Sequence, residues 1–266
     1  MSDASSTAPH TAPSTPPAPP RLQWRIFTVL WLLGLPGVSA LVWSIIPLWR
    51  HSHALPPQWG YSPASQLLVL SALLALAVGI GVLLAPRVGL AAPVLTTWIA
   101  GRSPLQALRR AWLPGLAGGV AGAACLVTLA IVWPESLKVA EPLYTMPLLS
   151  KLLYGSLTSE LLLRWGMLAC VFWSLWRLAG RDAPPSPAMG WTAVALSALL
   201  WAALHWLLAR WLLGPLPSLL LLHVVLGKLA YGLLAGFLCW RFGLEAAILA
   251  HMLTYLLSHG LIGPVL

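Results

Sequence analysis

Residues 148–178 read LLSKLLYGSLTSELLLRWGMLACVFWSLWRL, a long apolar run that carries Glu160 and Arg164 near its middle. A helix needs about 20 consecutive apolar residues to cross a bilayer, so this run predicts a membrane-spanning helix that tilts or protrudes. Glu160 and Arg164 have i, i+4 spacing and therefore share one face of the helix. An arginine placed in this way can hold a carboxylate and keep it ionised. The pair is either a structural ion pair that lets the helix insert or part of a functional site.

The composition of the whole chain is that of a membrane protein. Of the 266 residues, 59% are hydrophobic and only 8% are charged, whereas soluble domains carry about 25% charged residues. This difference excludes a water-soluble globule and a disordered chain. The formal charge of +9 comes from 15 Lys and Arg against 6 Asp and Glu. Because the basic residues are spread along the chain, no nucleic-acid partner is expected.

Apolar runs along the chain predict an all-α fold, a polytopic transmembrane helix bundle of about seven spans. Residues 1–22 are rich in Pro, Ser, Thr and Ala and are predicted to form a disordered tail. Residues 23–266 then form the transmembrane domain. The segment 87–110 is interrupted by proline and glycine and carries several arginines, so it is predicted to lie at the membrane interface. The predicted spans are about 26–49, 66–85, 111–133, 148–178, 191–213, 218–240 and 244–262.

The distribution of basic residues predicts the orientation in the membrane. With seven spans, the N-terminal tail, the 87–110 segment and the 179–190 loop lie on one side, and the C-terminus lies on the other. The first side is rich in arginine, which favours the cytoplasm. We therefore expect a cytoplasmic N-terminus and an external C-terminus. The basic residues of the cytoplasmic side are Arg21, Arg25, Arg87, Arg102, Arg109, Arg110, Arg177, Arg181 and Arg241.

Other polar side chains inside the predicted spans are functional candidates, because a charge at the centre of a membrane helix costs about 2.5–3.5 kcal/mol. His205 ends the stretch Trp201-Ala-Ala-Leu-His205 in the fifth span, and His251 lies in the seventh. Carboxylate and imidazole are ligands of hydrolytic zinc, and they also activate water without a metal. Both chemistries stay open. Lys228 in the sixth span is expected to be a counter-ion or to reach a cavity.

Three short motifs carry a resemblance to a known family. They are Ser159-Glu160-Leu-Leu-Leu-Arg164, Trp201-Ala-Ala-Leu-His205 and His251-Met-Leu-Thr-Tyr255. In this order, on separate spans, they resemble the E-E-x-x-x-R, F-x-x-x-H and H-x-x-x-N/D motifs of the CPBP family of intramembrane proteases, also called the CAAX prenyl endopeptidase or Abi family. The resemblance covers about residues 148–262.

The resemblance implies an endopeptidase of the bacterial inner membrane that hydrolyses a peptide or protein substrate in a cavity of the bundle, surrounded by lipid. The implied catalytic residues are Glu160, Arg164, His205 and His251. Water would be activated by carboxylate and imidazole. Because the family is commonly labelled a metalloprotease, zinc is a candidate cofactor with His205 and His251 as its ligands, and a metal-free mechanism is the alternative.

The chain departs from the family motifs at two positions. Ser159 stands where the family has the glutamate usually regarded as the activator of water, and Tyr255 stands where it has Asn or Asp. A serine cannot act as a base near neutral pH. Glu160 is one residue on, about 100° around a regular helix, so it can take the role only if the helix is rotated. If it does not, the chain is a catalytically weakened member or a membrane scaffold.

A third hypothesis is a small transporter with a proton relay through Lys228 and the histidines. The chain has no pair of broken helices at matching positions in two halves, which such transporters use. The peptidase is the favoured hypothesis.

Overall fold

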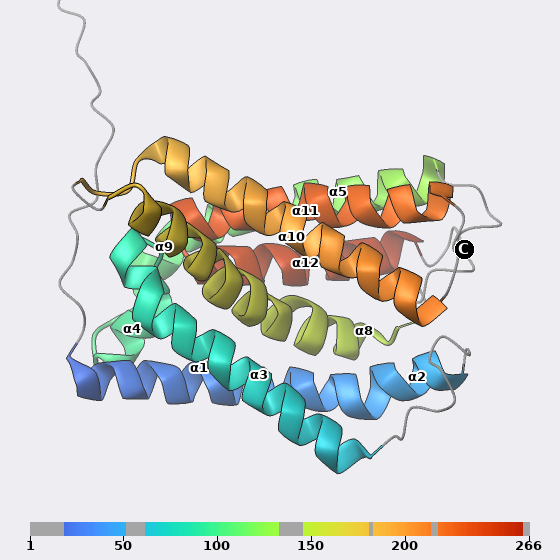
Figure 1. Cartoon of the computed structure of the whole chain (residues 1–266), viewed down its shortest axis with the longest axis horizontal. Helices are drawn as coiled ribbons and strands as arrows, with labels where there is room; N and C mark the ends of the chain where they lie inside the picture. Colours follow the sequence, from blue (N-terminus) through green and yellow to red (C-terminus); the bar gives the residue numbers. More distant parts are fainter. Residues whose placement is uncertain (1–18, 52–61, 133–145, 181–182, 214–217, 263–266) are drawn as a thin grey trace, which may run out of the picture.

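The computed structural model describes residues 19–51, 62–132, 146–180, 183–213 and 218–262. This part of the chain contains helices and no strand, and the long helices run roughly side by side (Figure 1). The all-α bundle predicted from the sequence is confirmed. The helices are α1 (Pro20–Ala40), α2 (Ile46–His51), α3 (Pro63–Leu84), α4 (Pro93–Ile99), α5 (Leu105–Val132), α8 (Leu148–Ser150), α9 (Ala169–Leu178), α10 (Pro187–Leu213), α11 (Ser218–Phe242) and α12 (Leu244–Ile262).

Six helical segments of the described chain are long and apolar enough to cross a membrane, and they coincide with the first six predicted spans. This makes the chain a multi-pass membrane protein. The seventh predicted span, 244–262, corresponds to α12, which has 19 residues but is not among the six. Helix α12 carries Glu245, His251 and His259, and it packs along α5 and α11.

The end of the predicted tail (residues 1–22) and the predicted interfacial segment (87–110) both contain helix in the structure. Residues 1–18 of the predicted tail lie outside the described part of the chain, and residues 20–22 form the first turn of α1, with Pro20 at its start. Proline suits that position because its missing N–H has no helical partner there. Within the segment 87–110, α4 has only 7 residues, too few to cross a bilayer.

The helix that spans Leu148–Leu178 lies between two groups of helices (Figure 1). On one side it packs against α1 and α3, and on the other against α10 and α12. The contact with α1 is close, because a Cβ at Gly37 would overlap Thr158 and the backbone of Leu153. Thr158 also donates a hydrogen bond of 2.8 Å to the carbonyl of Gly34. The N-terminal helix therefore braces the helix that carries Glu160.

The same helix is not a regular α-helix. Two π-helical segments, η3 (Lys151–Thr158) and η4 (Leu161–Leu168), stand on either side of Ser159 and Glu160. A π-helical turn holds more residues than the 3.6 of an α-helical turn, and such turns are rare and frequent at functional sites. Each wide turn changes the direction in which the following side chains point, which matters for the placement of Glu160.

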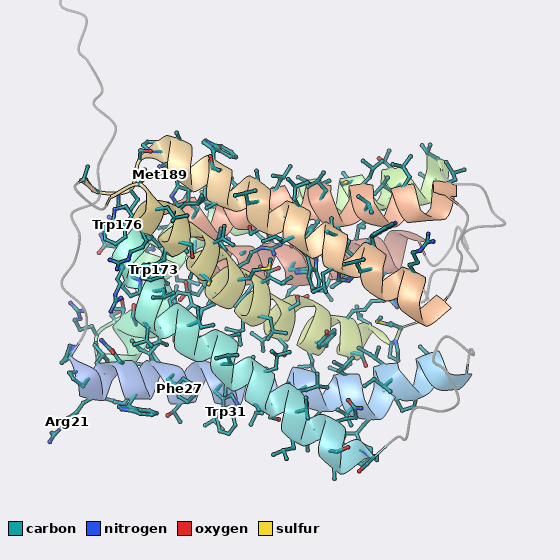
Figure 2. The ribbon with its side chains drawn as sticks, in the orientation of Figure 1. Arg21, Phe27, Trp31, Trp173, Trp176 and Met189 are labelled. Carbon is teal, nitrogen blue, oxygen red and sulfur yellow. The ribbon has the colours of Figure 1, made fainter. Side chains whose placement is uncertain are left out.

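The arginines of the predicted cytoplasmic side gather at one end of the bundle. That end holds the starts of α1 and α5 and the ends of α3, α9 and α11. Figure 2 places Arg21, Trp176 and Met189 there. Eight of the nine arginines are described and all eight are exposed, and Arg181 lies outside the described residues. The orientation relative to the cytoplasm stays a prediction.

Candidate active site

Glu160 and His251 meet in the interior of the bundle. The Nδ1 of His251, on α12, lies 2.7 Å from Oε1 of Glu160. Glu160 is fully buried, and His251 is 12% exposed. An ionised carboxylate only accepts hydrogen bonds, so Nδ1–H donates and the Nε2 of the imidazole keeps its lone pair. The pair thus presents a nitrogen that can take a proton.

Arg164 completes the buried charge cluster. Its Nε lies 3.4 Å from Oε2 of Glu160, and its side chain is 2% exposed. A buried carboxylate needs a charge partner of this kind to stay ionised. Neither Oε2 of Glu160 nor Nε of Arg164 has a hydrogen bond within the described part of the chain. The two atoms therefore have hydrogen-bonding capacity left over for a molecule that enters the site.

The Ser159 hydroxyl is bound within its own helix. It donates a short hydrogen bond to the carbonyl of Gly155, one turn earlier in the same helix. Glu160, and not Ser159, faces His251. Glu160 thus reaches His251 from a helix that is π-helical on both sides of it, so its direction is not the one that a regular α-helix would give.

Tyr255 lies beside His251 on α12. The two rings stack with centroids 4.9 Å apart and an interplanar angle of 29°. The tyrosine ring also fills a notch at Gly155, where a Cβ would lie 2.8 Å from Cε2 of Tyr255. Both departures from the family motifs, Ser159 and Tyr255, thus contact Gly155.

His205 stands apart from the Glu160–His251 pair. The contacts that the structure gives for its ring are with Trp201 of its own helix, at 3.9 Å between centroids, and Nδ1–H donates to the carbonyl of Trp201 at 3.3 Å. Lys228 of α11 acts electrostatically on both His205 and His251. The structure therefore joins Glu160, Arg164 and His251 by direct contact and gives no direct contact between His205 and these three residues within the described part of the chain.

One aromatic residue next to the pair was missed by the sequence analysis. Tyr231 of α11 packs on the imidazole of His251, with ring centroids 4.2 Å apart. It lies three residues after Lys228, on the same helical face. Its position three residues after the one lysine of the sixth span is the feature of the sequence that could have identified it as a site residue.

The donor set does not suit a catalytic zinc ion. Such an ion takes three protein ligands and keeps one position open. Among the described residues, no three His, Cys, Asp or Glu side chains come together in a way that could hold a metal ion. The Nδ1 of His251 is directed at Glu160, and the positive charges of Arg164 and Lys228 lie close by. These residues offer no zinc site in this arrangement.

Comparison with protein families adds one finding. Residues 141–257 match the Rce1-like family, described as type II CAAX prenyl endopeptidase Rce1-like. The matched segment contains the complete Leu148–Leu178 helix, all of α10 and α11, and α12 up to His251 and Tyr255. No curated protein matches the chain, and no solved structure matches it.

Proposed function

Because residues 141–257 match the Rce1-like family of type II CAAX prenyl endopeptidases, we propose that the chain is an active intramembrane peptidase that hydrolyses a peptide bond with water. The observation that carries the proposal is the contact of 2.7 Å between Nδ1 of His251 and Oε1 of Glu160. A carboxylate that orients an imidazole and leaves its other nitrogen free is an arrangement for proton transfer.

In the proposed reaction His251 is the general base and Glu160 acts through it. The hydrogen bond from Nδ1 to Glu160 holds the imidazole in one tautomer. Because Glu160 is fully buried, its negative charge also stabilises the protonated form of the imidazole. Nε2 takes a proton from water as the water oxygen bonds to the carbonyl carbon. When the C–N bond breaks, Nε2 returns that proton to the amine nitrogen. Arg164 keeps Glu160 ionised throughout.

This scheme uses no metal ion. Its support is the donor geometry, in which Nδ1 of His251 is already directed at Glu160 and two cationic side chains are near. The competing prediction, zinc held by His205 and His251, is tested by metal analysis of the purified protein. Cleavage that continues in the presence of a chelator, by protein that contains no stoichiometric metal, is the expected result.

A membrane scaffold without hydrolysis is the second candidate. The observations that favour it are that the Ser159 hydroxyl is bound within its own helix and that the Tyr255 ring occupies the notch at Gly155. Under this hypothesis the Rce1-like fold binds a membrane peptide without cutting it. The bacterial inner membrane, with a cytoplasmic N-terminus, is the proposed location for both candidates.

The deciding experiment is cleavage of a peptide library by the full chain in detergent, with C-terminal prenylated and unprenylated peptides included. We expect cleavage by the wild-type protein and its loss in His251→Ala. The matched control is His259→Ala, on the same helix but exposed, which should cleave at the wild-type rate. A wild-type protein that binds peptides and cleaves none of them would favour the scaffold.

A further inference from the structure

Tyr231 occupies the space between α12 and α5 next to the proposed base. Its ring lies 4.2 Å from that of His251, at an interplanar angle of 40°. On the α5 side, a Cβ placed on Gly122 would lie 3.2 Å from Cε2 of Tyr231. The absence of a side chain at Gly122 therefore lets the tyrosine reach the imidazole. Tyr231 belongs to none of the three motifs.

The hydroxyl of Tyr231 is buried and has unused hydrogen-bonding capacity. Its oxygen makes no hydrogen bond within the described part of the chain. Thr254 is its neighbour at Gly122; its hydroxyl donates to the carbonyl of Gly119 at 3.2 Å, and its oxygen is the polar group near enough to interact with the Tyr231 hydroxyl. A buried hydroxyl without a complete hydrogen bond loses part of what water would give it. With only the Thr254 hydroxyl near it among the described residues, the Tyr231 hydroxyl has capacity for a further partner.

Two other buried atoms beside the pair have the same property. Oε2 of Glu160 and Nε of Arg164 also lack hydrogen bonds within the described residues, and both groups act electrostatically on Tyr231. Together these atoms comprise an acceptor (Oε2 of Glu160), a donor (Nε of Arg164) and a hydroxyl (Tyr231) that can both donate and accept a hydrogen bond. Water and a peptide carbonyl need such partners when they enter a buried site.

We propose that Tyr231 is a catalytic residue that donates a hydrogen bond to the carbonyl oxygen of the peptide bond being cut. The proposal rests on the proposed peptidase function. As the water oxygen bonds to the carbonyl carbon and Nε2 of His251 takes the proton, the C=O electron pair moves onto oxygen. The Tyr231 hydroxyl donates to that oxygen and keeps its own proton. The electron pair returns when the C–N bond breaks and Nε2 protonates the amine.

The test is Tyr231→Phe in the full chain, which keeps the ring on His251 and removes only the hydroxyl. Loss of one donor to a developing oxyanion lowers kcat by about 10²–10³-fold, and KM should change little. Tyr154→Phe removes a hydroxyl from a tyrosine outside the cluster, on η3, and should leave kcat unchanged. If Tyr231 only packs, Tyr231→Phe will match the wild type and Tyr231→Leu will not.

A second measurement separates catalysis from folding. A peptide aldehyde forms a tetrahedral hydrate that resembles the reacting centre, and the matching alcohol does not. Tyr231→Phe should weaken binding of the aldehyde and leave binding of the alcohol unchanged. Wild-type cleavage with an unaltered kcat in Tyr231→Phe overturns the role of Tyr231 alone. A wild-type protein that cleaves nothing overturns the peptidase and the role of Tyr231 together.

Discussion

Tyr255 and Gly155 meet across the interface between α12 and the helix that carries Glu160. A Cβ at Gly155 would lie 2.8 Å from Cε2 of Tyr255 and 3.2 Å from its hydroxyl oxygen. The carbonyl of the same glycine accepts the Ser159 hydroxyl. The two residues that depart from the family motifs therefore adjoin one turn of helix, and we expect a longer side chain at position 159 to compete with the tyrosine ring for the space beside Gly155.

The first prediction is that Ser159→Glu alone lowers the melting temperature and adds no activity. The longer side chain has to compete with the Tyr255 ring, and two adjacent buried carboxylates resist ionising together. Adding Tyr255→Asn should recover stability, with a coupling free energy of about 0.5–3 kcal/mol, as for residues in contact. Thermal melts of the wild type, the two single variants and the double variant measure it.

The same four proteins test the weakened-enzyme hypothesis. If the wild type is inert and Ser159→Glu, alone or with Tyr255→Asn, gains cleavage, then position 159 carries the missing base and Glu160 does not. Additive effects of the two substitutions on the melting temperature would show that the residues are not coupled through Gly155.

The second prediction concerns the carboxylate that orients the imidazole. Glu160→Gln removes the negative charge that stabilises protonated His251, so the cleavage rate should fall by roughly 10²–10⁴-fold, the range of general-base catalysis. The variant also leaves Arg164 as a buried charge without its counter-ion, which costs about 3–5 kcal/mol. Initial rates and thermal melts in one detergent measure both effects.

A double variant separates those two effects. Glu160→Gln combined with Arg164→Met removes both charges and should recover much of the lost stability, while the rate stays low. Cleavage at the wild-type rate by a folded Glu160→Gln protein would remove Glu160 from the catalytic assignment.

The third prediction concerns the attachment of the segment that contains α4. Oε1 of Glu245, in the first turn of α12, accepts a hydrogen bond of 2.9 Å from the backbone N–H of Leu95. Glu245→Ala leaves that N–H without its partner, at a cost of about 1–3 kcal/mol. Amide hydrogen exchange at Leu95 should become roughly tenfold to a hundredfold faster, at 1.4 kcal/mol per factor of ten. Glu245→Gln keeps an acceptor oxygen and should exchange more slowly than Glu245→Ala.

The fourth prediction is the location of the C-terminus outside the cytoplasm. It follows from the arginine-rich end of the bundle together with the seven crossings that the sequence predicts, with α12 as the seventh. A periplasm-active reporter fused after Leu266 should be active, and a cytoplasmic reporter at the same place should not. The reverse result would mean that the chain crosses the membrane an even number of times.

The sequence predicted the helical framework well because membrane spans are long and their hydropathy is a local property. It also singled out Glu160, Arg164 and His251, which contact one another in the structure, because polar groups inside apolar runs stand out. It could not give the direction of the Glu160 side chain, since nothing in the sequence of Lys151–Thr158 or Leu161–Leu168 marks a π-helix. Contacts such as Glu245 with Leu95, 150 residues apart, depend on the packed bundle and leave no local pattern.

The hydrogen bond from Thr158 to α1 shows that the segment matching the family depends on a helix outside that segment. The family match begins at residue 141, yet the backbone of the motif helix rests directly on Gly37, more than a hundred positions upstream. The segment that matches the family therefore does not pack on its own, and a fragment that begins at residue 141 would lose the contacts of α1 with the helix that carries Glu160. Evolution of the N-terminal helix and of the motif helix is then expected to proceed jointly, with changes at Gly34, Gly37 and Thr158 constrained as one surface.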